Sequence, residues 1–277
     1  MQVGITTTVI PTMATDIDVS DRGLVAVVNE VIDVFTPKGK YMTGWWGRGR
    51  VITVSHIRDL FVYGDTGYRV HFFDPAGEEH DAITIKGRHI GALNTSEDGF
   101  MSCGRYCGFY GYDGKLKWEV GLIKPSNKPA HYYGYWFVPD RLGNRIVIVN
   151  KGVVANTMDF GEPVVSVATC PDARLLAVAT RRYIILYDIT RPEHPLEHAR
   201  IYANGIISDV TFSDTCSHLA VAGTDGAGLT ILKMPDGDRS ETITKKDMKR
   251  VVWNADIIAS AGINRGVFVV SLENPII

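Results

Sequence analysis

The amino-acid sequence predicts an all-β fold, a seven-bladed β-propeller. Three observations indicate it. Short apolar runs of strand length are separated by turn residues, and the same group of runs recurs at intervals of roughly 40 residues. A further run at the N-terminus belongs to no group and is available to close a ring of blades.

The clearest unit extends from Ile207 to Met234. Val210 and Phe212 alternate with polar neighbours, the run 219–222 is small and apolar throughout, and the run 229–232 is aliphatic and β-branched. No run is long enough for a helix with its own apolar stripe. Such a pattern is typical of one four-stranded blade.

Seven such units follow one another along the chain. Their first strands are expected to end at Ser20, Ser55, Ser96, Val138, Cys170, Ser213 and Asn254. The fourth unit looks shortened, because only 153–160 separates its second strand from the next unit. We therefore expect the fourth blade to be irregular and to lack an outer strand.

The ends of the chain predict how the ring closes. The last unit finishes with 267–272 and has no outer strand, whereas Val3 to Ile10 precede the first unit. Pairing these two segments would make residues 1–10 the outer strand of the last blade and hide an open sheet edge. Residues 1–277 are then expected to form one propeller domain.

Degenerate motifs carry a resemblance to a known family. Tyr187-Asp188 and Phe73-Asp74 are the nearest forms of a Trp-Asp pair, and the run from Tyr112 to Trp118 looks like a quinoprotein-type blade ending. Together with the repeat, they make the chain resemble the WD40-like propeller superfamily over nearly its whole length. This resemblance implies the fold and leaves the activity open.

Composition narrows the class of protein. The chain has 277 residues, 45% of them hydrophobic, and a net charge of −2. It has no secretory signal and no apolar run of membrane-spanning length, so a cytoplasmic location is expected. The cysteines, Cys103, Cys107, Cys170 and Cys216, are expected to be buried free thiols.

The sequence contains no motif for catalysis. A nucleophile elbow, a phosphate loop and a zinc-binding helix are all missing. His194 and His198 have a helical spacing, but Pro192 and Pro195 favour a loop with two solvated histidines. Glu78-Glu79 and Glu97-Asp98 are expected in turns. The chain is therefore predicted to be no enzyme and to need no metal or cofactor.

Charge is predicted to separate onto two rims. In a propeller, the loops between blades and the turns between second and third strands share one rim, which we expect to be basic, while acids gather on the other. The cations assigned to it are Arg48, Arg50, Lys86, Arg88, Arg105, Lys124, Lys128, Lys151, Arg181, Arg182, Lys245, Lys246, Lys249 and Arg250.

A binding surface is predicted on this basic rim, where aromatic residues accompany the cations. Aromatic and arginine side chains are frequent anchors of protein interfaces. The residues expected to contact a partner are Trp45, Trp46, Arg48, Arg50, Arg88, Arg105, Tyr106, His131, Tyr132, Tyr133, Arg181, Arg182, Lys246 and Lys249.

The sequence thus predicts a non-enzymatic scaffold that binds an acidic protein segment. Two alternatives stay open: nucleic-acid binding on the same rim, where exposed aromatics could stack on bases, and an enzyme or cofactor binder that uses the axial channel. No membrane contact is expected.

Overall fold

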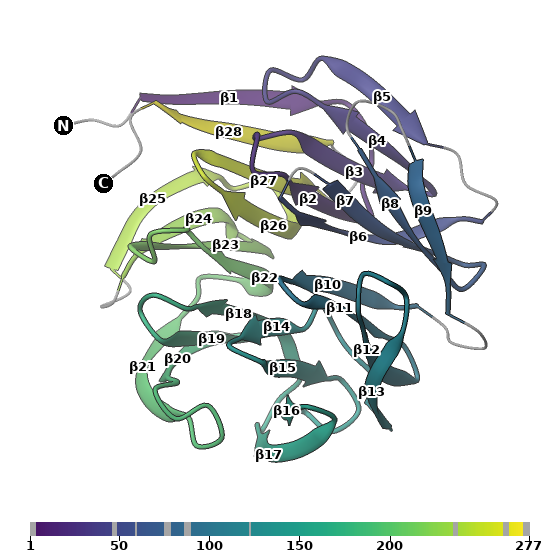
Figure 1. The fold of residues 1–277 in the computed structure, drawn as a ribbon. Coiled ribbons are helices and arrows are strands. Elements are labelled where there is room, and N and C mark those ends of the chain that lie inside the picture. The colour runs from purple at the N-terminus through teal and green to yellow at the C-terminus, as the bar shows by residue number, and fades with distance from the viewer. Residues whose placement is uncertain are drawn as a thin grey trace.

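The computed structural model describes residues 4–45, 49–58, 60–74, 79–85, 90–121, 123–234, 238–262 and 266–273. Within these ranges the chain forms strands and no helix, arranged as seven four-stranded antiparallel sheets around an axis (Figure 1). The predicted seven-bladed β-propeller is confirmed. The described residues accordingly contain no helix that could cross a membrane.

Each blade is numbered from its inner strand outward. Blade 1 consists of β2 (Asp16–Val19), β3 (Val25–Asn29), β4 (Val31–Phe35) and β5 (Tyr41–Trp45), and blade 2 of β6 (Val51–Ile57), β7 (Leu60–Asp65), β8 (Arg69–Phe73) and β9 (Glu79–Thr84). Blade 3 consists of β10 (Ala92–Ser96), β11 (Gly99–Cys103), β12 (Tyr106–Tyr110) and β13 (Leu116–Gly121), and blade 4 of β14 (Ala130–Tyr132), β15 (Tyr135–Asp140), β16 (Arg145–Asn150) and β17 (Val153–Asp159). Blade 5 consists of β18 (Val164–Cys170), β19 (Leu175–Thr180), β20 (Tyr183–Asp188) and β21 (Leu196–Tyr202). Blade 6 consists of β22 (Ile206–Phe212), β23 (His218–Thr224), β24 (Gly228–Lys233) and β25 (Asp238–Thr244). Blade 7 consists of β26 (Met248–Asn254), β27 (Ile257–Gly262), β28 (Val267–Glu273) and β1 (Gly4–Ile10).

The N-terminal strand closes the ring, as predicted. β1 pairs antiparallel with β28 in an unbroken register from Gly4 opposite Glu273 to Ile10 opposite Val267, and the two strands lie side by side in Figure 1. Blade 7 is therefore built from both ends of the chain. Its outer strand covers the edge that β28 would otherwise expose.

The fourth blade is irregular in a different way from the one predicted. Its outer strand, β17, is present and pairs with β16, so the expectation of a missing strand is wrong. The irregular element is the inner strand β14, which has 3 residues. Val138, expected to end the first strand, lies in the second strand β15, because the inner strand is too short to show as an apolar run.

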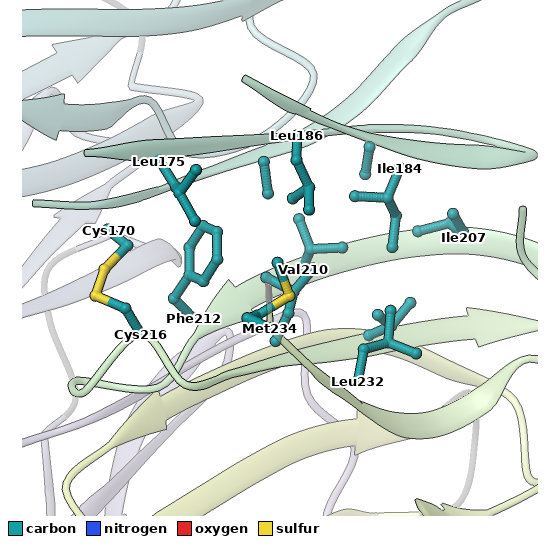
Figure 2. Close-up of a cluster of buried hydrophobic side chains, with 14 residues drawn as sticks. Cys170, Leu175, Ile184, Leu186, Ile207, Val210, Phe212, Cys216, Leu232 and Met234 are labelled. Atoms are coloured by element: carbon teal, nitrogen blue, oxygen red, sulfur yellow. A yellow bond between two sulfur atoms is a disulfide. The ribbon is translucent and has the colours of Figure 1, made fainter. Parts of the chain in front are cut away.

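The core consists of apolar layers between neighbouring blades. The middle strand β19 is buried at every position, since both of its faces pack against other blades, whereas the outer strand β21 alternates between exposed and half-buried residues. Between blades 5 and 6, Leu186 and Leu175 face Val210 and Phe212 (Figure 2). Full burial of such a side chain stabilises the fold by roughly 1.5–3 kcal/mol.

All four cysteines are paired in the structure, so the prediction of free thiols is wrong. Cys170 and Cys216 join blades 5 and 6 with their Cα atoms 5.8 Å apart, at the edge of the core in Figure 2. Cys103 and Cys107 face each other across the hairpin β11–β12. The expected cytoplasmic location rested partly on free thiols, and it loses that support because disulfides form in oxidising compartments.

Candidate functional site

The topology defines two rims of the propeller. Each inner strand starts at the rim that carries the loops between blades, and the turns between second and third strands return to it. We call this the basic rim. The opposite rim carries the turns between first and second strands and those between third and fourth strands.

Several predicted contact residues lie on the basic rim with exposed side chains. Arg105 and Tyr106 occupy the turn between the second and third strands of blade 3, and Arg181 and Arg182 the equivalent turn of blade 5. Lys246 and Lys249 follow β25 and are also exposed. Arg50 is exposed too, but its charge is paired with Glu30 at 3.0 Å.

The aromatic part of the predicted surface is different. Trp45 is half-buried, and its ring lies 5.4 Å from the ring of Tyr63 and 4.9 Å from that of His71, between blades 1 and 2. It therefore has a packing role. Trp46, Arg48 and Arg88 lie outside the described residues, as does Lys86.

His131, Tyr132 and Tyr133 lie on the opposite rim, so the expectation that they share the basic rim is wrong. They form the end of β14 and the turn into β15, where Tyr133 is 72% exposed and Tyr132 is buried. The error follows from the short inner strand of blade 4. Because that strand was not recognised in the sequence, the second strand of the blade was assigned as its first. Lys151 is on the opposite rim for the same reason.

Two further cations that were predicted for the basic rim have side chains that point to the propeller axis instead. The Lys128 Nζ donates a hydrogen bond to the Ile17 carbonyl at 3.1 Å, and Arg250 Nε lies 3.8 Å from Asp16 Oδ1. Both side chains line the axial channel. The basic rim thus has fewer free cations than the sequence predicts, and they are unevenly spread over it.

A groove on the basic rim lies between blades 3 and 4, and we name it the blade 3–4 groove. Its volume is about 480 Å³. Its lining residues are Gly91, Gly104, Arg105, Ile123, Lys124, Pro125 and Leu142. Leu142 is 76% exposed beside the buried Ile123, and Arg105 and Lys124 are exposed at the margin.

Buried contacts hold the walls of this groove in place. The Asp140 carboxylate is buried and accepts hydrogen bonds from the Lys124 and Leu142 N–H groups and from Arg145 Nε. The Arg141 N–H donates to the Lys124 carbonyl at 2.9 Å, which fixes the backbone of this exposed residue next to the groove lining. On the other wall, the Cys103–Cys107 disulfide spans the turn that carries Arg105.

The axial pocket, about 520 Å³ in volume, is lined by the inner strands. The segment before β14 closes one end of it. Asn127 Nδ2 donates to Asp209 Oδ1 at 2.8 Å, and Lys128 crosses the axis to Ile17. Asn127 and Lys128 also line a cavity of about 40 Å³ on the basic-rim side, so they partition the channel.

Two buried aspartates at this end of the pocket accept hydrogen bonds from residues of neighbouring blades. Asp209 on β22 accepts hydrogen bonds from Ser166 Oγ at 2.6 Å and from the Val251 N–H at 3.1 Å. Asp16 on β2 accepts from Thr53 Oγ1 at 2.9 Å and from the Val54 N–H at 3.0 Å. Burial raises the pKa of Asp209, against the attraction of Arg250 and these donors.

A histidine and a third aspartate form the next level of the pocket. His56 Nδ1 lies 2.9 Å from Asp18 Oδ1, and its Nε2 lies 3.5 Å from Asp21. Burial opposes the charge on both groups, but their mutual attraction outweighs it, raising the pKa of His56 and lowering that of Asp18. Burial lowers the pKa of His131, which also lines the pocket.

Asp16, Asp18 and Asp209 are functional candidates that the sequence-based analysis missed. The signal was present, since each is an acidic residue within an inner strand, Asp16 and Asp18 on β2 and Asp209 in the middle of β22. A carboxylate buried in such a strand requires a partner, because an unpaired buried charge is strongly destabilising. The partners come from other blades and could not be assigned from the sequence.

The described residues contain no group of three or more His, Cys, Asp or Glu side chains placed to hold a metal ion. His194 and His198 are exposed on the outside of blade 5. Comparison with known proteins finds no protein-family model and no curated protein that matches the chain. Function must therefore be argued from the groove and the pocket themselves.

Proposed function

We propose that this propeller is a non-enzymatic scaffold that holds an acidic protein segment in the blade 3–4 groove. The observation that carries the proposal is the combination of apolar lining and free positive charge. Leu142, Ile123 and Pro125 offer contact to an apolar side chain, Arg105 and Lys124 lie at the margin, and Arg141 adjoins Leu142 in the chain. The expected occupant is a segment with one apolar anchor flanked by Asp or Glu.

The three cations are available for such a partner. None of Arg105, Lys124 and Arg141 has an ion pair with any residue that the structure describes, unlike Arg50, which pairs with Glu30. Adjacent cations at the margin of an apolar groove attract acidic partners over a distance of about 8 Å at physiological salt. The groove should therefore favour both the encounter with an acidic segment and its anchoring.

The geometry favours a protein over a nucleic acid. A nucleic-acid track combines a continuous line of cations with exposed rings on which bases stack. Here Trp45 packs between blades, and the centre of the groove is aliphatic. Tyr106 is exposed next to Arg105, but a single ring does not make a line of stacking platforms. The acidic net charge of −2 also disfavours a duplex.

Membership of the WD40-like superfamily is part of the same proposal. It is supported by the four-stranded blades and by ring closure through an N-terminal outer strand. A location in the cytoplasm is likewise proposed from the sequence, and its test is the redox state of the cysteines in cells.

The test is selection of peptides from a random display library on the immobilised protein. Acidic sequences with one apolar anchor should be enriched, and binding of the best peptide should fall more than about tenfold in the triple variant R105E/K124E/R141E. The matched control, R181E/R182E/K246E, carries the same charge change on the same rim and should bind normally.

Three results would overturn the proposal: enrichment of neutral or basic peptides, equal losses in both triple variants, or unchanged binding in the groove variant. Fluorescein-labelled oligothymidine serves as the nucleic-acid arm of the experiment. If it binds more tightly than the selected peptide and its binding is lost in R105E/K124E/R141E, the groove is a nucleic-acid site and the protein proposal fails.

A further inference from the structure

Most of the charge inside the axial pocket is already used to hold blades together. The Asp209 carboxylate accepts hydrogen bonds from Asn127, from Ser166 and from the Val210 and Val251 N–H groups. The contacts of the Asp16 carboxylate with Thr53, with the Val54 N–H and with Lys128 at 3.2 Å all fall on its Oδ2, and its Oδ1 faces Arg250 Nε at 3.8 Å. The Asp209 carboxylate therefore has little capacity left for a ligand.

Besides Asp16 Oδ1, two charged groups of the same pocket keep unused hydrogen-bonding capacity. The closest contact of the Arg250 guanidinium joins its Nε to Asp16 Oδ1 at 3.8 Å, which is beyond hydrogen-bond distance. Asp18 uses Oδ1 for His56 and for the Val19 N–H, while its Oδ2 lies 3.7 Å from Lys128 Nζ. Within the described part of the chain, neither the guanidinium nor this oxygen has a hydrogen-bond partner.

The two groups differ in depth. All inner strands run from the basic rim to the opposite rim, and Arg250 lies level with Asp16 near the closed end of the pocket. Asp18 follows Asp16 by two residues on the same strand, so it shares a face with it and lies nearer the open end. A ligand that enters the pocket therefore meets the free carboxylate oxygen before the free guanidinium.

The charges in the buried part of the pocket balance one another. Asp16, Asp18 and Asp209 are opposed there by Lys128, Arg250 and His56, whose positive charge Asp18 stabilises, while Asp214 also lines the pocket but is exposed. A ligand with a net charge would upset this balance in a partly buried site, at a cost in desolvation. A dipolar ligand with no net charge matches the guanidinium of Arg250 at one end and the free oxygen of Asp18 at the other.

We propose that the axial pocket binds a free α-amino acid, whose carboxylate contacts the Arg250 guanidinium and whose ammonium group contacts Asp18 Oδ2. The planar guanidinium fork is suited to a carboxylate, and both contacts are charge-assisted hydrogen bonds. A cavity of about 520 Å³ lies in the usual range for small-ligand pockets, about 300–1,000 Å³. The pocket is separate from the blade 3–4 groove, so neither proposal depends on the other.

The test begins with the wild-type protein. Each standard L-amino acid is screened by thermal shift at about 10 mM, a concentration that detects dissociation constants in the millimolar range. The best ligand is then compared by calorimetry with its amide, which lacks the carboxylate, and its N-acetyl derivative, which lacks the ammonium group. Each derivative should bind at least about tenfold more weakly than the parent amino acid.

Variants then assign each loss to its residue. In Arg250→Met the amide should bind as well as the amino acid, because the guanidinium that contacts the carboxylate is gone. In Asp18→Asn the N-acetyl derivative should bind as well as the amino acid, because the carboxylate that contacts the ammonium group is gone. Arg250→Lys keeps the charge without the fork and should bind with intermediate affinity. Arg174→Met, which removes an exposed cation on a turn of the opposite rim, is the control and should bind like wild type.

The proposal fails if no amino acid shifts the melting temperature, or if both derivatives bind as tightly as the parent. It also fails if the amide still binds as much more weakly than the amino acid in Arg250→Met as in the wild type, or if the N-acetyl derivative does so in Asp18→Asn. Because the comparison of derivatives uses the wild-type protein, a variant that does not fold leaves the test intact.

Discussion

Lys128, carried by blade 4, places its Nζ 3.2 Å from Asp16 Oδ2 on blade 1, across the propeller axis. The same amine donates to the Ile17 carbonyl and lies 3.7 Å from Asp18 Oδ2. The lysine side chain is 20% exposed and the two carboxylates are nearly buried. A single cation thus contacts two acids of another blade and closes one end of the axial pocket.

Replacing Lys128 should therefore destabilise the fold. Lys128→Met leaves Asp16 and Asp18 without their shared cation, and loss of one partner of a buried ion pair costs about 3 kcal/mol. Denaturant unfolding of the purified protein measures this. Lys124→Met, an exposed lysine four residues earlier, should change the free energy of unfolding by less than about 0.5 kcal/mol. Equal effects of the two substitutions would contradict the role assigned to Lys128.

His56 should make stability depend on pH. Burial lowers its pKa, but Asp18 and Asp21 outweigh burial and raise it above its ordinary value, and Lys128 opposes them only weakly. The remaining polar neighbour is the Asn254 amide. A raised pKa in the folded state means that the imidazolium stabilises fully below the unfolded pKa of about 6.5, and that this contribution is lost as pH rises through the folded value.

Denaturation curves between about pH 5 and about pH 9 test this expectation. The difference in free energy of unfolding between the wild type and His56→Gln should shrink as pH rises. His131 and His218, whose pKa values burial lowers, contribute the opposite slope, but equally in both proteins, so they do not affect this difference. His198→Gln, which removes an exposed histidine, should leave the profile unchanged. A wild-type profile that already matches His56→Gln would show that His56 gains no charge on folding.

The two disulfides should contribute unequally. Cys170 and Cys216 are separated by 46 residues and Cys103 and Cys107 by 4. Loop-closure entropy then gives at most about 4 kcal/mol for the first bridge and about 2 kcal/mol for the second. Unfolding of Cys170→Ser/Cys216→Ser and of Cys103→Ser/Cys107→Ser measures the difference. Alkylation of the oxidised wild type followed by mass spectrometry should find no reactive thiol, and four labelled cysteines would contradict the pairing.

Gly266 should be required at the junction of β1 and β28. Its φ is +91°, and a Cβ there would collide with the Ile10 carbonyl oxygen. Gly266→Ala therefore adds a steric clash to a backbone strain of roughly 1–3 kcal/mol. Gly226→Ala, with a φ of +97° and open space around it, isolates the strain, and Gly161→Ala has neither problem. Melting temperatures should fall in the order Gly161→Ala, Gly226→Ala, Gly266→Ala, and equal values for the last two would exclude the clash.

The fold could be predicted from the sequence because its signals are local. Runs such as 219–222 and 229–232 reveal their strands by composition, and the unassigned N-terminal run required a partner. The inner strand of blade 4 escaped detection because β14 has 3 residues and follows a segment with two prolines. A strand that short has no periodicity of its own.

The candidate sites were harder to predict because they depend on side-chain direction. Lys128 and Arg250 were assigned to the correct end of their strands, yet they point to the axis, which the order of residues does not specify. The pairing of Cys170 with Cys216 depends in the same way on two blades meeting. Trp45 is the opposite example. It was predicted to be an exposed contact residue because it lies near cations in the sequence, but it packs on Tyr63 and His71.

The pairing of β1 with β28 also constrains how the chain can mature. Translation produces Gly4 long before its partner Glu273, so the N-terminal strand stays unpaired while the blades between them form. Contacts between such distant positions in the chain are slow to form. Until they form, the nascent protein carries two unsatisfied strand edges, and this interval is when another copy of the strand could insert and exchange between molecules.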